Sequence, residues 1–323
     1  MTIILVLDTE TTGFANYPKE VHEYFTSLSK GSVVSKAKKD PIYLKYKSNI
    51  LQLSYIVYDL DHPKKAKIYD KYILPEKSLV DKISLGASEV HGITEESLKS
   101  KQKNMFTTIE DAIDELKRDV KSCHVFVGHN IGYDISRIEE EVRRTNTVFS
   151  VTNSLDEEFI KAIKSKKYDT MTQTKVACGI PGKKKGSIKN PSLAEAYEHF
   201  FNDKANEKAL HNALVDIIVC LRVYVKHVYG RDICGENKVI TRWIEDLSSI
   251  PDFKCDTGFS ASVSKRSSSD SLDKPISVDM KQKPVKTPGL FSCIGSLCST
   301  RKKTLAMGGR KTRKRNHITH VKT

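Results

Sequence analysis

The sequence lacks any apolar run that approaches the ~20 residues a helix needs to cross a bilayer. Its N-terminus also lacks the basic region, apolar stretch and small-residue cleavage site of a secretion signal. We therefore expect an intracellular protein, in the cytoplasm or nucleus, with no membrane span. The 7 cysteines include no C-x-x-C pair, so the sequence indicates neither a disulfide framework nor a zinc site and predicts reduced thiols. Cys293 and Cys298 lie in a small apolar island where lipidation is one alternative.

Positive charge is distributed unevenly along the chain. Residues 251–323 contain 16 Lys and Arg against 5 Asp and Glu, so 11 of the 14 net charges belong to this segment. Its apolar content is too low to offset the entropy of ordering the chain, which predicts a disordered basic tail. The cluster Arg310–Arg315 suits nucleic acid or an import receptor. We expect a catalytic domain over residues 1–230, a helical extension over 231–250 and the tail over 251–323.

The beginning of the chain carries the first chemical signal. Ile3–Leu7 is a purely apolar run, typical of a central strand that is covered on both sides. Asp8 ends the run, and Glu10 points to the same side because side chains alternate along a strand. Two carboxylates at that distance repel each other unless a cation lies between them, so the pattern favours a hard divalent metal.

Two later segments bring further acids to the ends of apolar elements. His124–Val127 predicts a second strand, and the helix that follows it begins near Asp134. A plain helix cap is the alternative role for Asp134. A long helix after Asn212 carries Asp216. On a continuous helix His211 and Asp216 would lie roughly 140° apart, so His211 must lie on the preceding loop if both face one site.

Four carboxylates gathered in one place need compensating positive charge. A pair of Mg²⁺ or Mn²⁺ ions, completed by substrate phosphate, meets that need and implies phosphodiester chemistry. One ion would generate the attacking hydroxide and the other would stabilise the leaving 3′ oxygen. An imidazole is suited to take the proton from water.

The remaining patterns predict the frame around this site. Residues 50–58 and 67–74 are β-branched and aromatic runs joined by a polar turn, which predicts a hairpin, and residues 109–120 show helical spacing. Residues 15–48 are rich in Lys and Tyr and form an insertion after the first strand. Gly182–Gly186 encloses three lysines and is either a phosphate contact or a solvated turn. The order of elements predicts an α/β fold with a central mixed sheet and helices on both faces.

These residues resemble the DEDDh 3′→5′ exonucleases of the ribonuclease H-like fold. The likeness rests on three ordered motifs, Asp8–Gly13, His129–Asp134 and His211–Asp216, and extends over about residues 1–230. A tyrosine in place of His211 would indicate the DEDDy group instead. The resemblance implies metal ligands Asp8, Glu10, Asp134 and Asp216, the general base His211, and a lining for the 3′-terminal nucleotide that comprises Thr11, Thr12, Phe14, His91 and His129.

The implied function is hydrolysis from the 3′ end of single-stranded DNA or RNA, and the sequence does not decide between the two. One alternative is a non-catalytic nucleic-acid-binding or scaffolding protein with the same fold. Another is a proofreading subunit that acts with a polymerase or other replication proteins. The basic ending after Gly308 and Gly309 is also similar to tails of proteins encoded by large DNA viruses, which would imply a virus-infected cell or a virion.

Overall fold

The computed structural model describes residues 2–14, 23, 44–149, 154–205 and 210–255. Within these ranges one 6-stranded mixed sheet forms the centre of the molecule, in the order β4-β3-β2-β1-β5-β6. The Ile3 strand is internal, as predicted, because β1 pairs with β2 on one side and with β5 on the other. The strands are β1 (Ile3–Thr11), β2 (Ile50–Asp59), β3 (Lys67–Ile73), β4 (Phe106–Thr107), β5 (Val125–Gly128) and β6 (Lys167–Asp169).

The strand directions bring the predicted acids to one end of the sheet. β1 and β2 are antiparallel, and β2 and β3 form the predicted hairpin. β5 and β6 run parallel to β1, so the carboxyl ends of all three lie together. Asp8 and Glu10 follow the buried part of β1 at that end. The second acidic segment follows β5 at the same edge.

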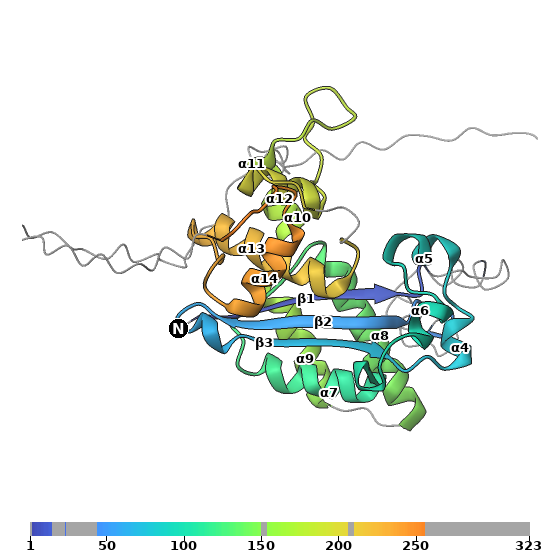
Figure 1. Ribbon diagram of the computed structural model, residues 1–323. Helices are drawn as coiled ribbons and strands as arrows, with labels where there is room; N and C mark the ends of the chain where they lie inside the picture. Colours follow the sequence, from blue (N-terminus) through green and yellow to red (C-terminus); the bar gives the residue numbers. More distant parts are fainter. Residues whose placement is uncertain (1, 15–22, 24–43, 150–153, 206–209, 256–323) are drawn as a thin grey trace, which may run out of the picture. The chain divides into compact units, whose positions relative to one another are not determined.

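Three helices cover one face of the sheet (Figure 1). They are α7 (Ile109–Val120), α8 (Ile131–Phe149) and α9 (Ser154–Ser165). Their apolar side chains meet the odd-numbered residues Leu5 and Leu7 of β1 in one core. α7 has the predicted helical stripe, with Thr108 as its N-cap.

The opposite face is covered by α13 (Ala213–Tyr229) and α14 (Lys238–Leu247), and α12 (Leu193–Phe201) packs against α13 (Figure 1). α13 is buried along most of its length because it lies between the sheet and these helices. Helices on both faces of a mixed sheet confirm the predicted fold class. The shorter helices are η1 (Pro63–Lys65), α4 (Lys77–Val80), α5 (Leu85–His91), α6 (Glu95–Lys99), η2 (Lys103–Met105), α10 (Thr170–Gln173) and α11 (Lys175–Cys178).

The predicted insertion at 15–48 is held together at its base. The backbone N–H of Thr12 donates to the Asn49 carbonyl at 2.9 Å, and the Asn49 N–H donates back to Thr12 Oγ1 at 3.0 Å. The Ser48 hydroxyl also donates to the Gly13 carbonyl. On α8, the Arg144 guanidinium donates to the Ser48 carbonyl at 2.8 Å. Most of the insertion lies outside the described residues.

The expectation of reduced thiols throughout is wrong for two cysteines. Cys234 and Cys255 form a disulfide, with their Cα atoms 5.2 Å apart. The chain returns to the sheet after α14 and brings together residues 21 positions apart, a spacing that no short motif reveals. Phe253 packs on the same core and Cys255 is buried, so the fold continues past residue 250. Residues 256–323, with Cys293, Cys298 and the basic cluster, lie outside the described ranges.

In the part of the chain that the structure describes, none of the helices is both long and apolar enough to traverse a bilayer.

Candidate active site

β1 directs its two acids toward α13. Ile4 and Val6 pack with α13, and since side chains alternate along a strand, Asp8 and Glu10 lie on that same face. The regular pairing with β2 continues to Glu10 and shifts between Glu10 and Thr11. The strand therefore presents both carboxylates just before its regular pairing ends.

α13 supplies the third acid from the other side of the site. The Asn212 side chain caps the helix by accepting a hydrogen bond from the Leu214 N–H at 3.1 Å, as predicted. Asp216 lies in the first turn, where carboxylate oxygens of Asp8, Glu10 and Asp216 come within 4.8 Å of one another. Oδ1 of Asp216 is buried and has no hydrogen-bond partner among the residues that the structure describes. Residues more than 200 positions apart in the sequence thus form one acidic cluster.

Asp134 lies beside this cluster, in the first turn of α8. It is buried, and its Oδ1 accepts hydrogen bonds from the Thr9 N–H at 3.1 Å and the Thr9 hydroxyl at 2.8 Å. Asp134 does not belong to the group of Asp8, Glu10 and Asp216 whose oxygens lie within 4.8 Å of one another. The charge of Asp134 nevertheless raises the pKa of Glu10. These bonds tie the start of α8 to β1 and fix the carboxylate of Asp134 next to the other three.

Burial and mutual repulsion make these acids hard to ionise in the absence of a cation. Burial raises the pKa of Asp8 from 3.8 to about 7. Burial and then the charges of Asp8, Asp216 and Asp134 raise the pKa of Glu10 to about 9. The pKa values of Asp134 and Asp216 are also raised, first by burial and then by the charge of Asp8.

The donor set fits a hard divalent cation. Carboxylate oxygens are the ligands that Mg²⁺ and Mn²⁺ prefer, and the oxygens of Asp8, Glu10 and Asp216 already lie within a few ångströms of one another. The buried oxygen of Asp216 that has no partner among the described residues is free to bind such a cation. A cation would remove the repulsion that raises the pKa values. Asp8, Glu10 and Asp216, with Asp134 alongside, could therefore hold metal.

His211 lies on the loop before α13, as the helical geometry required. Its backbone is left-handed, with φ 66°, and its side chain is exposed. Its backbone lies close enough to the Asp216 carboxylate to lower the pKa of that group, against the larger effect of burial. The charges of His211 and His91 lie close enough to interact. The backbone of His211 is thus next to the acidic cluster, and the residue is open to solvent.

Of the residues predicted to line the nucleotide site, Thr11, Thr12 and His91 are held by hydrogen bonds within the protein, whereas Phe14 is exposed. Thr11 and Thr12 are buried, and Oγ1 of Thr12 accepts the Asn49 N–H described above. The His91 ring bonds to the Thr11 carbonyl at 3.0 Å and accepts the Ile93 N–H, which attaches the end of α5 to the end of β1. Phe14 is 89% exposed, so its ring is available to a ligand.

His129 is held more firmly by the protein than the motif suggested. Nδ1 bonds to the Thr170 hydroxyl at 3.0 Å, and Nε2 bonds to the Pro191 carbonyl at 3.1 Å. A carbonyl only accepts, so Nε2 carries the proton. Burial lowers the pKa of His129, which favours this neutral ring. Its role toward a nucleotide stays a prediction.

Tyr133 is a site residue that the motif analysis did not single out. Its hydroxyl bonds to Oγ1 of Thr11 at 3.0 Å, and its ring meets Phe14 edge-on with centroids 6.4 Å apart. The guanidinium of Arg137 lies over the same ring, 4.9 Å from its centroid. Tyr133 directly precedes Asp134 in the second motif, and this position next to a predicted metal ligand could have identified it as a site residue.

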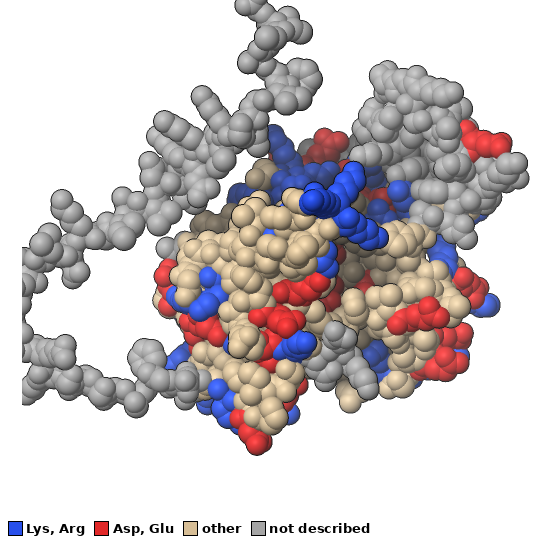
Figure 2. All heavy atoms as spheres, turned by 90° about the horizontal axis from the view of Figure 1, so that it is seen from above, with Lys and Arg blue, Asp and Glu red and all other residues tan. Residues whose placement is uncertain are grey.

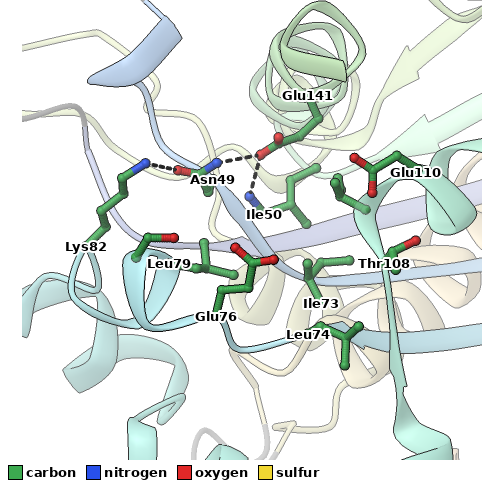
Figure 3. A pocket seen from close by; sticks show the side chains of 12 residues that line it. Asn49, Ile50, Ile73, Leu74, Glu76, Leu79, Lys82, Thr108, Glu110 and Glu141 are labelled. Carbon is green, nitrogen blue, oxygen red and sulfur yellow. Dashed lines mark hydrogen bonds between the residues drawn. The ribbon is translucent and has the colours of Figure 1, made fainter. Parts of the chain in front are cut away.

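A second residue missed from the sequence is Glu141, which lines a cavity of about 250 Å³ together with Asn49 and Ile50 (Figure 3). Its Oε1 accepts the Ile50 N–H at 2.9 Å and pairs with Arg144 at 2.5 Å, and the Asn49 amide lies 3.4 Å away. Asn49 in turn holds Thr12. Glu141 comes seven residues after Asp134, on nearly the same face of α8, and that spacing could have identified it.

The chain is similar to one protein family and to several solved structures. A family model described as Exonuclease (RNase T) matches residues 5–224. No curated protein matches the chain significantly. Among solved structures, Escherichia coli exonuclease I in complex with a dT13 oligonucleotide is 12% identical, with a TM-score of 0.43 and coverage of 70% of this chain and 41% of that one.

Two further structures show similar coverage of this chain. The catalytic unit of Neurospora crassa Pan2 (protease and nuclease domain) is 17% identical, with a TM-score of 0.40 and coverage of 69% and 26% of the two chains. Exonuclease I from Methylocaldum szegediense is 14% identical, with a TM-score of 0.41 and coverage of 72% and 42%. The chain thus spans about two fifths of the length of the exonuclease I proteins. The family match covers all four acids and, except for the first two residues of β1, every strand of the sheet, and the chain belongs to the exonuclease family.

Proposed function

We propose that this protein is a metal-dependent exonuclease that removes nucleotides from the 3′ end of single-stranded nucleic acid. The observation that carries the proposal is the cluster of Asp8, Glu10 and Asp216, in which one buried oxygen of Asp216 has no hydrogen-bond partner among the described residues. A fold that only binds nucleic acid gains nothing from holding repelling acids together. The cost of burying them is understandable if they bind cations that the reaction needs.

The residues around the cluster have separate tasks in this proposal. Asp8, Glu10, Asp134 and Asp216 hold two Mg²⁺ or Mn²⁺ ions, which would lower the pKa of a bound water and stabilise the leaving oxygen. His211 accepts the proton of the attacking water. Its loop position supports this role, because the exposed ring can release that proton to solvent.

Phe14, Tyr133, Thr11 and His91, which we name the rim residues, would orient the 3′-terminal nucleotide. Phe14 offers an exposed ring for stacking on a base, and Tyr133 supports that ring from the side. Thr11 and His91 are fixed by their mutual contacts and would position the ribose end. The exposed loop position of His211 and the geometry of the rim together support the DEDDh type of exonuclease over a simple binding module.

The proposal is tested with end-labelled oligonucleotides of one sequence, made as DNA and as RNA. The full-length protein is incubated with Mg²⁺, Mn²⁺ or EDTA. A 5′ label should report a ladder of progressively shorter products, and a 3′ label should be released at once as a mononucleotide. EDTA should stop both reactions. Release of mononucleotides from the 5′ end, or activity undiminished by EDTA, would refute the proposal.

Two variants connect the activity to the site. Asp216→Ala should abolish turnover, whereas Glu96→Gln, which removes an exposed carboxylate on α6, should leave turnover unchanged. If Asp216→Ala retains activity within a few-fold of the wild type, the cluster is not the active site. A comparison of DNA with RNA in the same assay identifies the preferred sugar, since discrimination depends on how the site meets the 2′ hydroxyl.

A further inference from the structure

Between α11 and α12 the chain forms a small hairpin with a basic tip, residues 180–190, which we name the lysine hairpin. Pro181 and Ile188 form a bridge across it, and the Gly182 N–H donates to the Ser187 carbonyl at 2.7 Å. The Ser187 hydroxyl closes the tip by donating to the Lys184 carbonyl at 2.6 Å. The hairpin extends beyond α11 and α12, away from the sheet (Figure 1). It is therefore a defined structure and not merely a run of charge.

The three lysines at the tip have no acidic partner within the described residues. Lys183, Lys184 and Lys185 are exposed, and they occur in none of the ion pairs of that part of the chain. Lys189, at the base, instead pairs with Glu195 at 2.5 Å. Lys and Arg side chains gather on this upper side of the molecule (Figure 2). Three unneutralised cations on one turn produce a local field that attracts a polyanion.

The base of the lysine hairpin is attached to the active-site end of the sheet. The carbonyl of Pro191, directly after the hairpin, accepts a hydrogen bond from the ring Nε2–H of His129 at 3.1 Å. His129 follows Gly128 at the end of β5. Gly128 packs so closely on β1 that a Cβ there would lie 3.1 Å from the carbonyl oxygen of Leu7, the residue before Asp8. A short chain of direct contacts thus connects the hairpin to the strand that carries the acids.

We propose that the lysine hairpin binds the sugar-phosphate backbone of the substrate on the 5′ side of the bond that is cut. This inference rests on the proposed exonuclease function. The tip lies three to four residues from the base, so it extends about 10–13 Å at ~3.3 Å per residue. At ~3.4 Å or more per nucleotide, that reach corresponds to about two to four nucleotides beyond the scissile linkage. Lysines contact phosphates without reading bases, so the hairpin increases affinity for any sequence.

The test compares two triple variants of the full-length protein. One is Lys183→Gln, Lys184→Gln and Lys185→Gln. The matched control is Lys64→Gln, Lys65→Gln and Lys121→Gln, three exposed lysines at the opposite end of β1 and β5. Both variants lose the same net charge, so a general electrostatic effect would change them equally.

Two substrates separate backbone binding from chemistry. The first is a single strand of about 20 nucleotides, longer than the ~4–16 nucleotides that a single-strand site covers. The second is the p-nitrophenyl ester of a nucleoside 5′-monophosphate, which has no upstream phosphates. For the hairpin variant we expect kcat/KM on the strand to fall about tenfold through KM, and its dependence on log salt to flatten by about 2, from three contacts at ~0.7 each. Hydrolysis of the ester should not change, and the control should match the wild type.

The results distinguish this inference from the proposed function. Equal losses in the two triple variants, no loss in either, or a parallel loss on the nitrophenyl ester would overturn the role of the hairpin. Binding of a fluorescent strand in EDTA gives a readout that does not need turnover, and the hairpin variant should bind about tenfold more weakly there as well. A wild-type protein that hydrolyses neither substrate would refute the exonuclease proposal, while the binding comparison would still decide the inference about the hairpin.

Discussion

Replacing Asp8 with Asn should make the metal-free protein more stable while it destroys the metal site. The change is nearly isosteric and removes one charge from a cluster whose members repel one another. A carboxyl whose pKa is raised in the folded state stabilises the fold below its unfolded pKa, and this contribution is lost as the pH rises through the folded value. For Asp8 the two values are 3.8 and about 7, and the pKa of Glu10 rises to about 9. The metal-free wild type should therefore lose stability from about pH 4 upward, through about pH 7 for Asp8 and about pH 9 for Glu10.

The size of the effect follows from the same values. A change in pKa from 3.8 to about 7 corresponds to a cost of about 4 kcal/mol for ionising Asp8 in the fold. Solvent reaches these half-buried oxygens and the neighbouring acids take up protons in exchange, so we expect Asp8→Asn to recover about 1–2 kcal/mol at pH 8. For a domain of this size, that gain raises Tm by about 2–8 °C.

Thermal unfolding at pH 6 and pH 8, with EDTA and with Mg²⁺ or Mn²⁺, measures this directly. At pH 8 in EDTA the variant should melt above the wild type, and at pH 6 the difference should shrink. Added metal should raise the Tm of the wild type and leave that of Asp8→Asn nearly unchanged, because the donor set is incomplete. Glu96→Gln on α6 controls for the loss of one negative charge. A lower Tm for Asp8→Asn in EDTA at pH 8, or an undiminished response to metal, would show that the acids do not repel as the structure implies.

Three further changes test other parts of the structure. His211→Ala should reduce turnover by ~10²–10⁴ while the metal-induced rise in Tm persists, and loss of that rise would make the residue a ligand. Glu141→Ala should lower the free energy of unfolding by about 1–3 kcal/mol because it leaves the buried Ile50 N–H without an acceptor and removes the ion pair with half-buried Arg144, whereas Glu141→Gln should cost less; equal stabilities by chemical denaturation would contradict this. Deleting residues 256–323 should weaken nucleic-acid binding and flatten its salt dependence without changing kcat, and an unchanged salt slope would indicate that the tail serves only as a transport address.

Local patterns were enough to predict much of the fold and the acids of the site. The apolar run before Asp8 specifies a buried strand, and the helical stripe after Asn212 places Asp216 toward the sheet. The position of His211 followed from the 100° step of a helix alone. These predictions succeed because each depends on neighbours within a few residues.

The contacts that complete the site are of another kind. Glu141 accepts a hydrogen bond from Ile50, 91 positions away in the sequence, and only the packing of α8 on the sheet brings the two together. The contacts of the His129 ring and the disulfide partner of Cys234 depend in the same way on where distant segments meet. A sequence pattern reveals the direction of a side chain, but not the partner that lies there.

The hydrogen bonds at the base of the insertion affect how far the length of this segment can vary. Thr12 and Asn49 bond to each other, and Arg144 bonds to the carbonyl of Ser48, just before Asn49. These bonds fix the pairing register of β1 and β2 whatever the length of the segment between them. The entropy of closing a flexible loop grows only with the logarithm of its length, by about 0.6 kcal/mol per doubling. The segment after Phe14 is therefore a place where residues can be added or removed at little cost to the fold. Phe14, directly before this segment, contacts Tyr133 of the site, so a dye or affinity tag inserted next to it would report on substrate as it arrives.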